Sequence, residues 1–263
     1  KSPLPYLRMS SAHLVAGDQA AAAEKLRKAL EITPNLLQAQ QGLASLAMAA
    51  NKPDALCLQE LKLEDKAFPV ADLEAAGYHA VFIGQKTYNG VAILSPQPID
   101  GASVVRNIPG FEDEQKRIIA ATINGVRVVC GYFPNGQAVG SDKFEYKLRW
   151  LAALTEWLRE ELKTHERLVL AGDFNIAPED RDAHPEWKDE IHVSEPERAA
   201  FRALQDLGLI DAFRLFEQPE KTFSWWDYRM LGFQRNLGLR IDHVLLTAGN
   251  IDVFTDFDIA IGA

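Results

Sequence analysis

The segment from Leu168 to Pro178 contains residue types that could hydrolyse a phosphate ester. It opens on uniformly apolar residues, as in a strand covered on both faces, and Gly172 would let another backbone or a ligand approach closely. Asp173 and Asn175 lie two residues apart, so an extended chain would direct both side chains to one side. The carboxylate could accept a proton from water while the carboxamide hydrogen-bonds a phosphate oxygen. A strand that ends in an Asx-rich turn fits this stretch equally well, so both interpretations stay open.

Three further polar side chains lie in or beside other apolar runs. Glu60 follows the apolar residues 55–58, where a carboxylate could hold Mg²⁺, although a strand-end surface position is the simpler interpretation. Tyr132 ends the run that begins at Val126, so it too lies at the end of a strand. Asp242 lies within an apolar strand, where an unpaired charge is costly, and therefore needs a partner. Polar groups at the ends of separate strands indicate a shared rim.

Other residues could contact a substrate or lie at the surface. Lys86 is in a polar turn, where it could bind a phosphate or simply be solvated. The aromatic residues around Trp225 could form either core or a surface on which a base or sugar stacks. His184 and His192 lack the spacing of metal ligands, so we expect both at the surface.

The apolar pattern predicts the elements that must position these residues. Asn124-Gly125 is the strongest short hairpin signal in the chain, and Gly208 is placed to end a helix. Around these points we expect strands over 54–58, 77–82, 91–94, 117–123 and 126–134, an amphipathic helix over 144–164, a strand over 168–171, a polar loop over 179–196 and a helix over 197–207.

The composition indicates a globular protein without a membrane span. Of the 263 residues, 47% are hydrophobic and 25% charged, which excludes a predominantly disordered chain. No apolar stretch is long enough to cross a bilayer, and residues 1–8 lack a signal-peptide core. The net charge of −9 excludes general adhesion to nucleic acid, so any such contact must come from a local patch. Cys57 and Cys130 lie in apolar runs, which favours buried thiols in a cytoplasmic protein.

The first 52 residues differ from the rest of the chain. They hold six Lys and Arg against three Asp and Glu, whereas the whole chain is acidic. Small and large residues recur over 3–50 at offsets that resemble one and a half tetratricopeptide repeats. Because so few repeats cannot close a solenoid core, we expect a helical hairpin that packs on the next part of the chain, with partner binding as the alternative. We therefore divide the chain into residues 1–51 and 52–263.

The chain also carries an ordered set of short motifs that resembles bacterial exodeoxyribonuclease III, of the endonuclease/exonuclease/phosphatase superfamily. Each piece alone is a weak signal, but their collinear order over about residues 52–247 is specific. The motifs are Leu-Gln-Glu at 58–60, Gly-Gln-Lys at 84–86, Asn-Gly-Val-Ala at 89–92, Gly-Tyr-Phe-Pro at 131–134, Gly-Asp-Phe-Asn-Ile-Ala-Pro at 172–178, Phe-Ser-Trp-Trp-Asp-Tyr-Arg at 223–229 and Gly-Leu-Arg-Ile-Asp-His at 238–243.

The resemblance implies a four-layer α/β sandwich with two mixed β-sheets flanked by helices. It also implies cleavage of double-stranded DNA 5′ to abasic sites and 3′→5′ exonuclease activity at 3′ ends, with Mg²⁺ or alternatively Mn²⁺ as cofactor. By match to the family motifs, the site consists of Glu60 as metal ligand, Asp173 as the group that orients or deprotonates water, Asn175 as phosphate ligand, Tyr132 near the scissile phosphate, Asp242 as the aspartate that orients a histidine, Trp225 in the pocket for the abasic sugar, and Arg117 as a DNA contact. We add Lys86 as a substrate contact because of its place in the polar turn.

Two departures from the family pattern bear on activity. The family's first strand, with its Asn-x-Asn motif, is replaced by the helical segment, and its last strand, with Ser-Asp-His, has no counterpart after Leu246. Because no histidine follows His243, the partner that Asp242 should orient is absent, and we expect weak or lost activity. We expect residues 251–259 to supply a substitute strand and a helix over 36–50 to take the place of a family helix.

Two other functions stay open at this point. The chain could be a catalytically inactive interaction module, in which the N-terminal hairpin binds a protein partner and the nuclease-like part is a scaffold. It could also be a phosphatase of the same superfamily that acts on small phosphoesters, although the aromatic residues around Trp225 argue against this.

Overall fold

The computed structural model describes residues 2–33, 39, 42, 46, 53–227 and 229–253. The chain divides into two compact units, with the boundary after Pro53. The first unit contains the N-terminal helices, and the second, Asp54–Asp258, contains every strand that the structure describes.

The first unit is a helical hairpin of α1 (Leu4–Val15) and α2 (Gln19–Ile32). Asp18 begins α2 by accepting a hydrogen bond from the backbone N–H of Ala21 at 3.0 Å. The two helices predicted here are confirmed. The tetratricopeptide assignment stays a prediction, and most of the helix expected over 36–50 lies outside the described residues. Apolar residues of α2 form the buried centre of the hairpin: Ala22, Leu26, Ala29 and Leu30.

The second unit is built on a six-stranded sheet. Its two central strands, β6 and β7, run parallel, and all other neighbours are antiparallel, so the sheet is mixed. Parallel pairing requires a long crossover, and the 23-residue helix α5 provides it. The order is β4 (Val105–Arg106), β5 (Ile118–Ile123), β6 (Val126–Tyr132), β7 (Leu168–Asp173), β11 (Asp242–Leu246) and β8 (Ile210–Asp211).

A three-stranded sheet faces the larger one. Its strands are β1 (Leu56–Leu58), β3 (Val91–Ser95) and β2 (His79–Ile83), in that order. Over the described residues this sheet is antiparallel throughout, so the expectation of two mixed sheets holds only for the larger one. A two-stranded ribbon of β9 (Trp225–Trp226) and β10 (Gly238–Leu239) completes the strands described.

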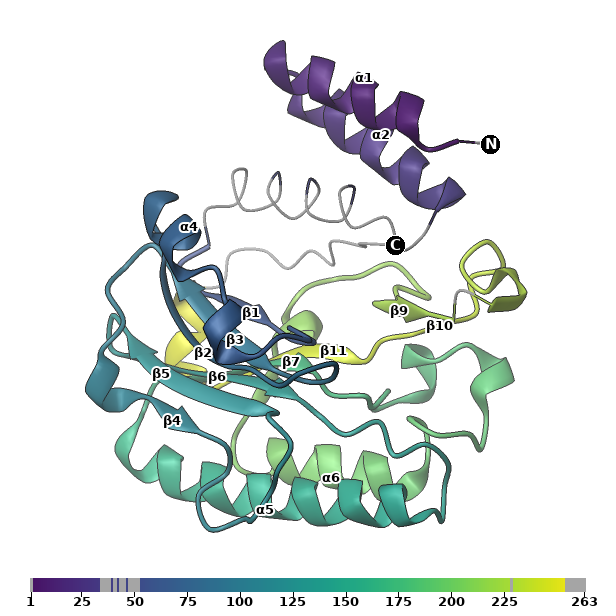
Figure 1. Cartoon of the computed structure of the whole chain (residues 1–263). Helices are drawn as coiled ribbons and strands as arrows, with labels where there is room; N and C mark the ends of the chain where they lie inside the picture. Colours follow the sequence, from purple (N-terminus) through teal and green to yellow (C-terminus); the bar gives the residue numbers. More distant parts are fainter. Residues whose placement is uncertain are drawn as a thin grey trace. The chain divides into compact units, whose positions relative to one another are not determined.

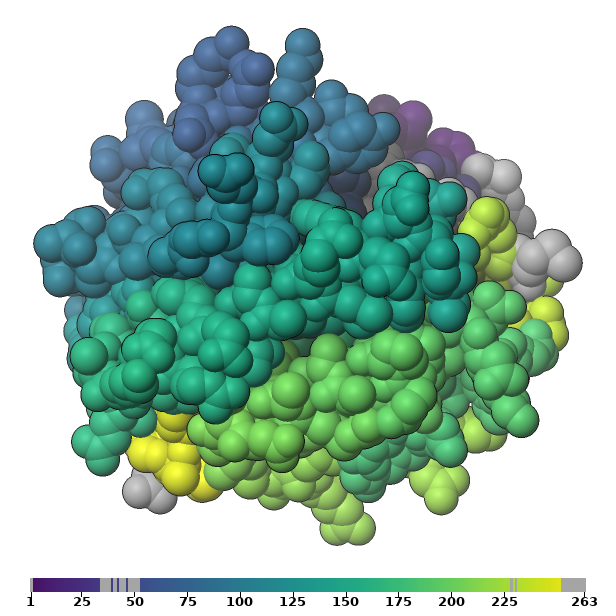
Figure 2. Space-filling view, turned by 90° about the horizontal axis from the view of Figure 1, so that it is seen from below, coloured from purple at the N-terminus to yellow at the C-terminus, as the bar shows by residue number. Residues whose placement is uncertain are grey.

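Helices cover the outer faces of both sheets. The helices α5 (Asp142–Thr164) and α6 (Glu195–Gln205) lie side by side on the larger sheet, as Figures 1 and 2 show, while α4 (Val70–Ala75) packs on the smaller one. Short 3₁₀ helices occupy Asp65–Ala67, Gly101–Ser103, Asp180–Asp182, Pro185–Trp187, Ala212–Leu215, Arg229–Leu231 and Ala248–Val253.

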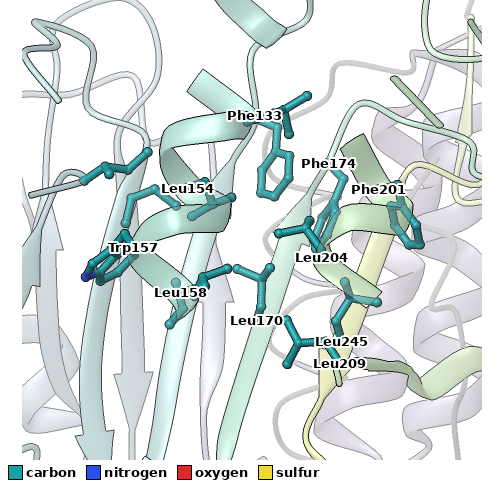
Figure 3. Close-up of a cluster of buried hydrophobic side chains, with 14 of the residues drawn as sticks. Phe133, Leu154, Trp157, Leu158, Leu170, Phe174, Phe201, Leu204, Leu209 and Leu245 are labelled. Atoms are coloured by element: carbon teal, nitrogen blue, oxygen red, sulfur yellow. The ribbon is translucent and has the colours of Figure 1, made fainter. Parts of the chain in front are cut away.

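Three apolar clusters separate four layers. Side chains alternate along β5, so Ile118 belongs to the cluster that includes residues of α5 and α6, while Ile119 belongs to the cluster that includes residues of the smaller sheet. Along β3, Ile93 faces the larger sheet and Leu94 faces α4. Figure 3 shows the cluster beneath α5 and α6, where Leu158 of α5 lies near Leu170 of β7, and Leu245 of β11 lies near Leu209. The predicted four-layer α/β sandwich is confirmed.

The structure also tests several local predictions. Asn124 and Gly125 both have positive φ, 48° and 77°, which confirms the hairpin. The long helix begins at Asp142 rather than 144, because the Ser141 hydroxyl caps it by accepting from the N–H of Phe144 at 3.2 Å. Residues 251–253 belong to a 3₁₀ helix, so no strand begins at 251, and the rest of the expected strand lies outside the described residues. Among the described helices, none combines the length and apolarity that a bilayer span needs.

Gly172 is required where β7 reaches its end. Its φ is +146°, and a Cβ atom there would lie 1.9 Å from the carbonyl oxygen of Gly131 on β6. We expect Gly172→Ala to lower the free energy of unfolding by about 2 kcal/mol or more, because neither backbone can move without breaking the parallel pairing. Urea unfolding followed by tryptophan fluorescence measures this, since all five tryptophans lie in the second unit. Gly101→Ala is the control, because a Cβ there meets nothing within 4 Å; equal losses in the two variants would contradict the steric account.

Candidate functional site

Three neighbouring strands bring Tyr132, Asp173 and Asp242 into one row. Tyr132, the last residue of β6, is in parallel register with Asp173, the last residue of β7. Asp173 in turn lies opposite Asp242, the first residue of β11. Adjacent strands are about 4.8 Å apart, so the three side chains start from neighbouring points on the same edge of the sheet.

Glu60 joins this row from the smaller sheet. It follows β1 with a φ of 54°, and its carboxylate accepts a hydrogen bond from the Tyr132 hydroxyl. The ammonium group of Lys62 lies 2.6 Å from the other carboxylate oxygen. The charge of Glu60 also contributes to raising the pKa of Asp173, so the two carboxylates open onto the same region. The structure therefore brings together Glu60, Tyr132, Asp173 and Asp242 from four strands.

Negative charge accumulates at this edge. Loss of solvent raises the pKa of Asp173 well above its usual range, and the neighbouring charge of Asp242 raises it further. Desolvation by the surrounding protein also raises the pKa of the Asp242 carboxyl, although the residue as a whole remains accessible to solvent. Burial would raise the pKa of Glu60, but the hydrogen bonds from Lys62 and Tyr132 outweigh it and leave the pKa low. Two adjacent carboxylates with raised pKa values favour a bound cation.

Asn175 adopts a conformation that the sequence pattern did not predict. Its φ is 51°, so the chain has left the extended geometry, and the argument from a spacing of two residues was wrong. Its backbone N–H donates to Asp173 Oδ1 at 2.8 Å, and its side-chain Nδ2 donates to the carbonyl oxygen of Phe133 at 3.1 Å. The side chain of Asn135 lies 3.4 Å from Asn175 Oδ1. The turn therefore fixes the carboxamide beside Asp173.

The partner of Asp242 is a hydroxyl group. Ser224 Oγ accepts hydrogen bonds from the N–H groups of Ile241 and Asp242, both at 3.0 Å, and its hydrogen bond to the carboxylate partly offsets the raised pKa. His243 lies on the opposite side of the strand, where its Nε2 donates to the carbonyl of Ile176 at 2.8 Å and its Nδ1 accepts from Arg240 at 2.9 Å. His243 is therefore a buried structural residue.

The three residues predicted to contact substrate lie at different distances from this row. Arg117 is next to it, because its guanidinium lies 5.2 Å from the centre of the Tyr132 ring and donates to the Tyr132 carbonyl at 3.2 Å. Trp225 is half-buried on β9, with its ring 5.7 Å from that of Trp187 and 6.5 Å from that of His192. Lys86 is exposed in the turn between β2 and β3, where its charge acts on Glu64.

His192 is buried, so the expectation of a surface position was wrong. Only 5% of the residue is exposed, and Nδ1 donates to the carbonyl of Asn175 at 2.7 Å. Burial and then the charge of Lys147 lower the pKa of His192 to about 4, so the ring is neutral at pH 7. His184 is partly exposed, which agrees better with the expected surface position. Because the contact to Asn175 spans 17 residues of loop, no local signal could have revealed it.

Two other residues behind the site were also missed. Lys147 lies on α5 and Glu197 on α6, and both are fully buried next to Asn175. A signal for Lys147 was present, because it is spaced three and four residues from the inward-facing Phe144 and Leu151. Position 147 therefore belonged to the apolar face, where a lysine requires a buried partner.

The donors at the site suit a hard divalent cation. Glu60, Asp173 and Asp242 offer carboxylate oxygens, and loss of solvent raises the pKa values of the two aspartates. Within the described residues, no group of three or more His, Cys, Asp and Glu side chains is placed to hold a metal ion, so the protein would supply few of the ligands. Mg²⁺ retains several waters and needs only one or two carboxylates, so these residues fit it.

Comparison with known proteins agrees with this geometry. The model of the Endonuclease/Exonuclease/phosphatase family matches residues 21–258. The chain belongs to this family. The match begins within the segment that we assigned to tetratricopeptide-like helices, so that assignment and the boundary at residue 51 stay predictions.

Members of the family with known names and structures resemble the chain over most of its length. Exodeoxyribonuclease III of Haemophilus influenzae is 35% identical over 252 residues, which is 89% of this chain and 92% of that protein. Exodeoxyribonuclease of Bacillus subtilis is 32% identical over 200 residues, which is 74% of this chain and 77% of that protein. The structure of the 3′ phosphatase NExo from Neisseria, bound to a product DNA hairpin, is 47% identical, with a TM-score of 0.78 and coverage of 83% and 85% of the two chains. An AP endonuclease from Archaeoglobus fulgidus is 36% identical, with a TM-score of 0.73 and coverage of 78% and 80%.

The buried state of His192 predicts a pH dependence of stability. An unfolded histidine has a pKa of about 6.5. The folded pKa is about 4, so this residue contributes stability above pH 6.5 that is lost as the pH falls towards 4. In the wild type the free energy of unfolding should therefore fall between pH 7.5 and pH 4. In His192→Gln we expect this fall to be smaller by about 2–3 kcal/mol, because the titrating group is gone. Urea unfolding at a series of pH values measures the difference. His79→Gln, at an exposed position on β2, is the control; if His192→Gln and wild type show the same pH dependence, His192 is not buried as described.

Proposed function

We propose that this chain is a Mg²⁺-dependent phosphodiesterase that acts in DNA repair, cleaving double-stranded DNA at abasic sites and processing its 3′ ends. The observation that carries the proposal is the row of Tyr132, Asp173 and Asp242 at one edge of the mixed sheet, with Glu60 beside it. The relatives support the substrate class, since they are named as exodeoxyribonucleases, a 3′ phosphatase and AP endonucleases. Nucleases of this family depend on a divalent metal.

The proposed chemistry assigns separate tasks to the residues of the row. Asp173 accepts a proton from the attacking water, and its raised pKa makes it a stronger base than an ordinary aspartate. The carboxamide of Asn175, fixed by its turn, hydrogen-bonds a phosphate oxygen. Burial and the neighbouring charge of Glu60 raise the pKa of Tyr132, so its hydroxyl stays protonated and can donate. Glu60, with Asp173 and Asp242 nearby, would hold Mg²⁺, which supplies positive charge to the phosphate.

Contacts to the DNA itself would come from cations and aromatic rings around the row. We propose that Arg117 binds a phosphate, since it already lies against Tyr132. Trp225 would line the pocket for an extruded sugar, and the exposed Lys86 would contact the backbone farther away. With a net charge of −9, binding then depends on this local set of cations and on low salt.

A role of the N-terminal hairpin in binding a protein partner stays a second proposal. One observation favours it: α1 exposes the apolar residues Leu4, Met9, Leu14 and Val15.

We also propose a cytoplasmic location. The two cysteines are free thiols, which agrees with that location.

Cleavage of defined DNA tests the main proposal. We expect Mg²⁺-dependent nicking of a duplex with one abasic site, and shortening of a duplex with a recessed 3′ end, both abolished by EDTA. Asp173→Asn should lower the rate by about 10²- to 10⁴-fold, because the amide cannot accept the proton. Asp142→Asn makes the same chemical change at an exposed position of α5 and should cleave normally. Equal cleavage by the wild type and Asp173→Asn would rule out the mechanism.

A further inference from the structure

A fully buried ammonium group lies directly behind the candidate site. Lys147, on α5, has no exposed surface, and its Nζ donates to the carbonyl oxygens of Asn175 at 2.7 Å and Asn135 at 3.2 Å. Its third hydrogen bond is to the carboxylate of Glu197 on α6. All three protons of the ammonium group therefore have acceptors, which is the condition under which a charge can be buried.

Glu197 is bound as completely as the lysine. It also receives hydrogen bonds from the backbone N–H of His192 at 3.1 Å, from the N–H of Ser194 at 3.2 Å and from the Ser194 hydroxyl at 2.5 Å. The ion pair thus joins three loop segments that carry Asn135, Asn175 and His192. These loops have no strand or helix of their own at this point, and the pair attaches their backbones to α5 and α6.

One of the three hydrogen bonds of Lys147 is with the backbone of a left-handed turn. Asn175 has a φ of 51°, a conformation that asparagine tolerates better than most residues and that these contacts can fix in place. Its carbonyl oxygen accepts two hydrogen bonds, from Lys147 Nζ and from His192 Nδ1, both at 2.7 Å. The lysine stem reaches this carbonyl past Gly136, where a Cβ atom would lie 3.1 Å from Lys147 Cδ.

Packing alone does not require a charge at this position. The neighbouring inward residues of α5, Phe144, Trp150, Leu151 and Leu154, are apolar, and a methionine would fill a similar volume. Burial itself lowers the pKa of Lys147, against the attraction of Glu197. Replacing a buried ion pair by apolar residues of similar size often leaves stability unchanged, so stability alone does not account for this pair.

We propose that Lys147, paired with Glu197, is a positioning residue that holds the Asn175 turn in its left-handed conformation and so directs the carboxamide at the substrate phosphate. Neither residue touches the substrate. The proposal rests on the function proposed above, because it assumes that Asn175 is the phosphate ligand.

Loss of the ion pair should affect kcat and KM differently. A displaced carboxamide loses an interaction with the reacting phosphate, while the contacts to the rest of the DNA remain. We therefore expect kcat to fall by about 10- to 100-fold in a variant without the pair, with KM changed less than about threefold. A purely structural role would instead lower the amount of folded protein and leave kcat per folded molecule unchanged.

The variant to use is the double substitution Lys147→Met with Glu197→Gln. Lys147→Met alone would leave a buried carboxylate without its cation and could unfold the chain, whereas the double variant buries no charge. The control is a second buried ion pair, Arg127 with Glu161, whose atoms lie 2.6 Å apart. It links the start of β6 to α5, away from the strand ends that carry the site. Arg127→Met with Glu161→Gln should leave kcat within about twofold of wild type.

A double-mutant cycle with Asn175→Ala tests whether the effect passes through Asn175. In the Asn175→Ala background, removing the Lys147–Glu197 pair should change kcat by less than about threefold, since the group it positions is already gone. A full 10- to 100-fold loss in both backgrounds would overturn the proposal.

A crystal structure of the double variant decides the question independently of activity. We expect Asn175 to leave the left-handed region and to lose the hydrogen bond from Nδ2 to the Phe133 carbonyl. If Asn175 keeps its conformation, the proposal is wrong even if the activity changes. If the wild type fails to cleave any DNA substrate, the proposed function fails, yet the structure of the variant still shows whether Lys147 and Glu197 hold the turn.

Discussion

The confinement of Asp173 and Asp242 at one edge of the sheet is the constraint on which the rest of the site depends. The two residues face each other across β7 and β11, and both pKa values are raised. Loss of solvent is the main cause for both carboxyls, and the charge of Asp242 adds to it at Asp173. The two residues cannot separate, because the backbone hydrogen bonds of the sheet fix their Cα atoms. A proton or a bound cation relieves the charge at this edge, and the raised pKa makes Asp173 a stronger base than an ordinary aspartate.

Aromatic packing beneath the strand ends stabilises this arrangement. Phe133 and Phe174 follow directly after the strand ends, are fully buried, and stack with ring centres 4.1 Å apart. Phe174 also packs against Phe201 of α6, as Figure 3 shows. Tyr132 and Asp173 are thus each followed at once by a buried phenylalanine. A sheet edge held in this way keeps like charges close together without local unfolding.

Sequence patterns predicted the parts of the site that depend on local order. The apolar runs placed Tyr132 and Asp173 at strand ends and Asp242 within a strand; the structure begins that strand at Asp242, and the strand register makes the three residues neighbours. What the patterns could not supply were contacts between distant segments. His192 reaches Asn175 across a loop, and the Lys147–Glu197 pair joins two helices that are far apart in sequence. The conformation of Asn175 follows from those contacts, which is why the argument from an extended chain failed.

The strand β11 links the site to the loop that forms its aromatic wall. Asp242 is on the accessible side, while Arg240 and His243 are buried beneath. Arg240 binds Asp182 at 2.7 Å and Asp211 at 2.8 Å, and Asp182 belongs to the same loop as Trp187 and His192. Because a guanidinium with two buried carboxylates has little freedom to move, a shift of this loop would require β11 to shift as well. The carboxylate row and the loop that carries Trp187 are therefore coupled through Arg240, so a substitution that loosens the loop also disturbs the strand that presents Asp242.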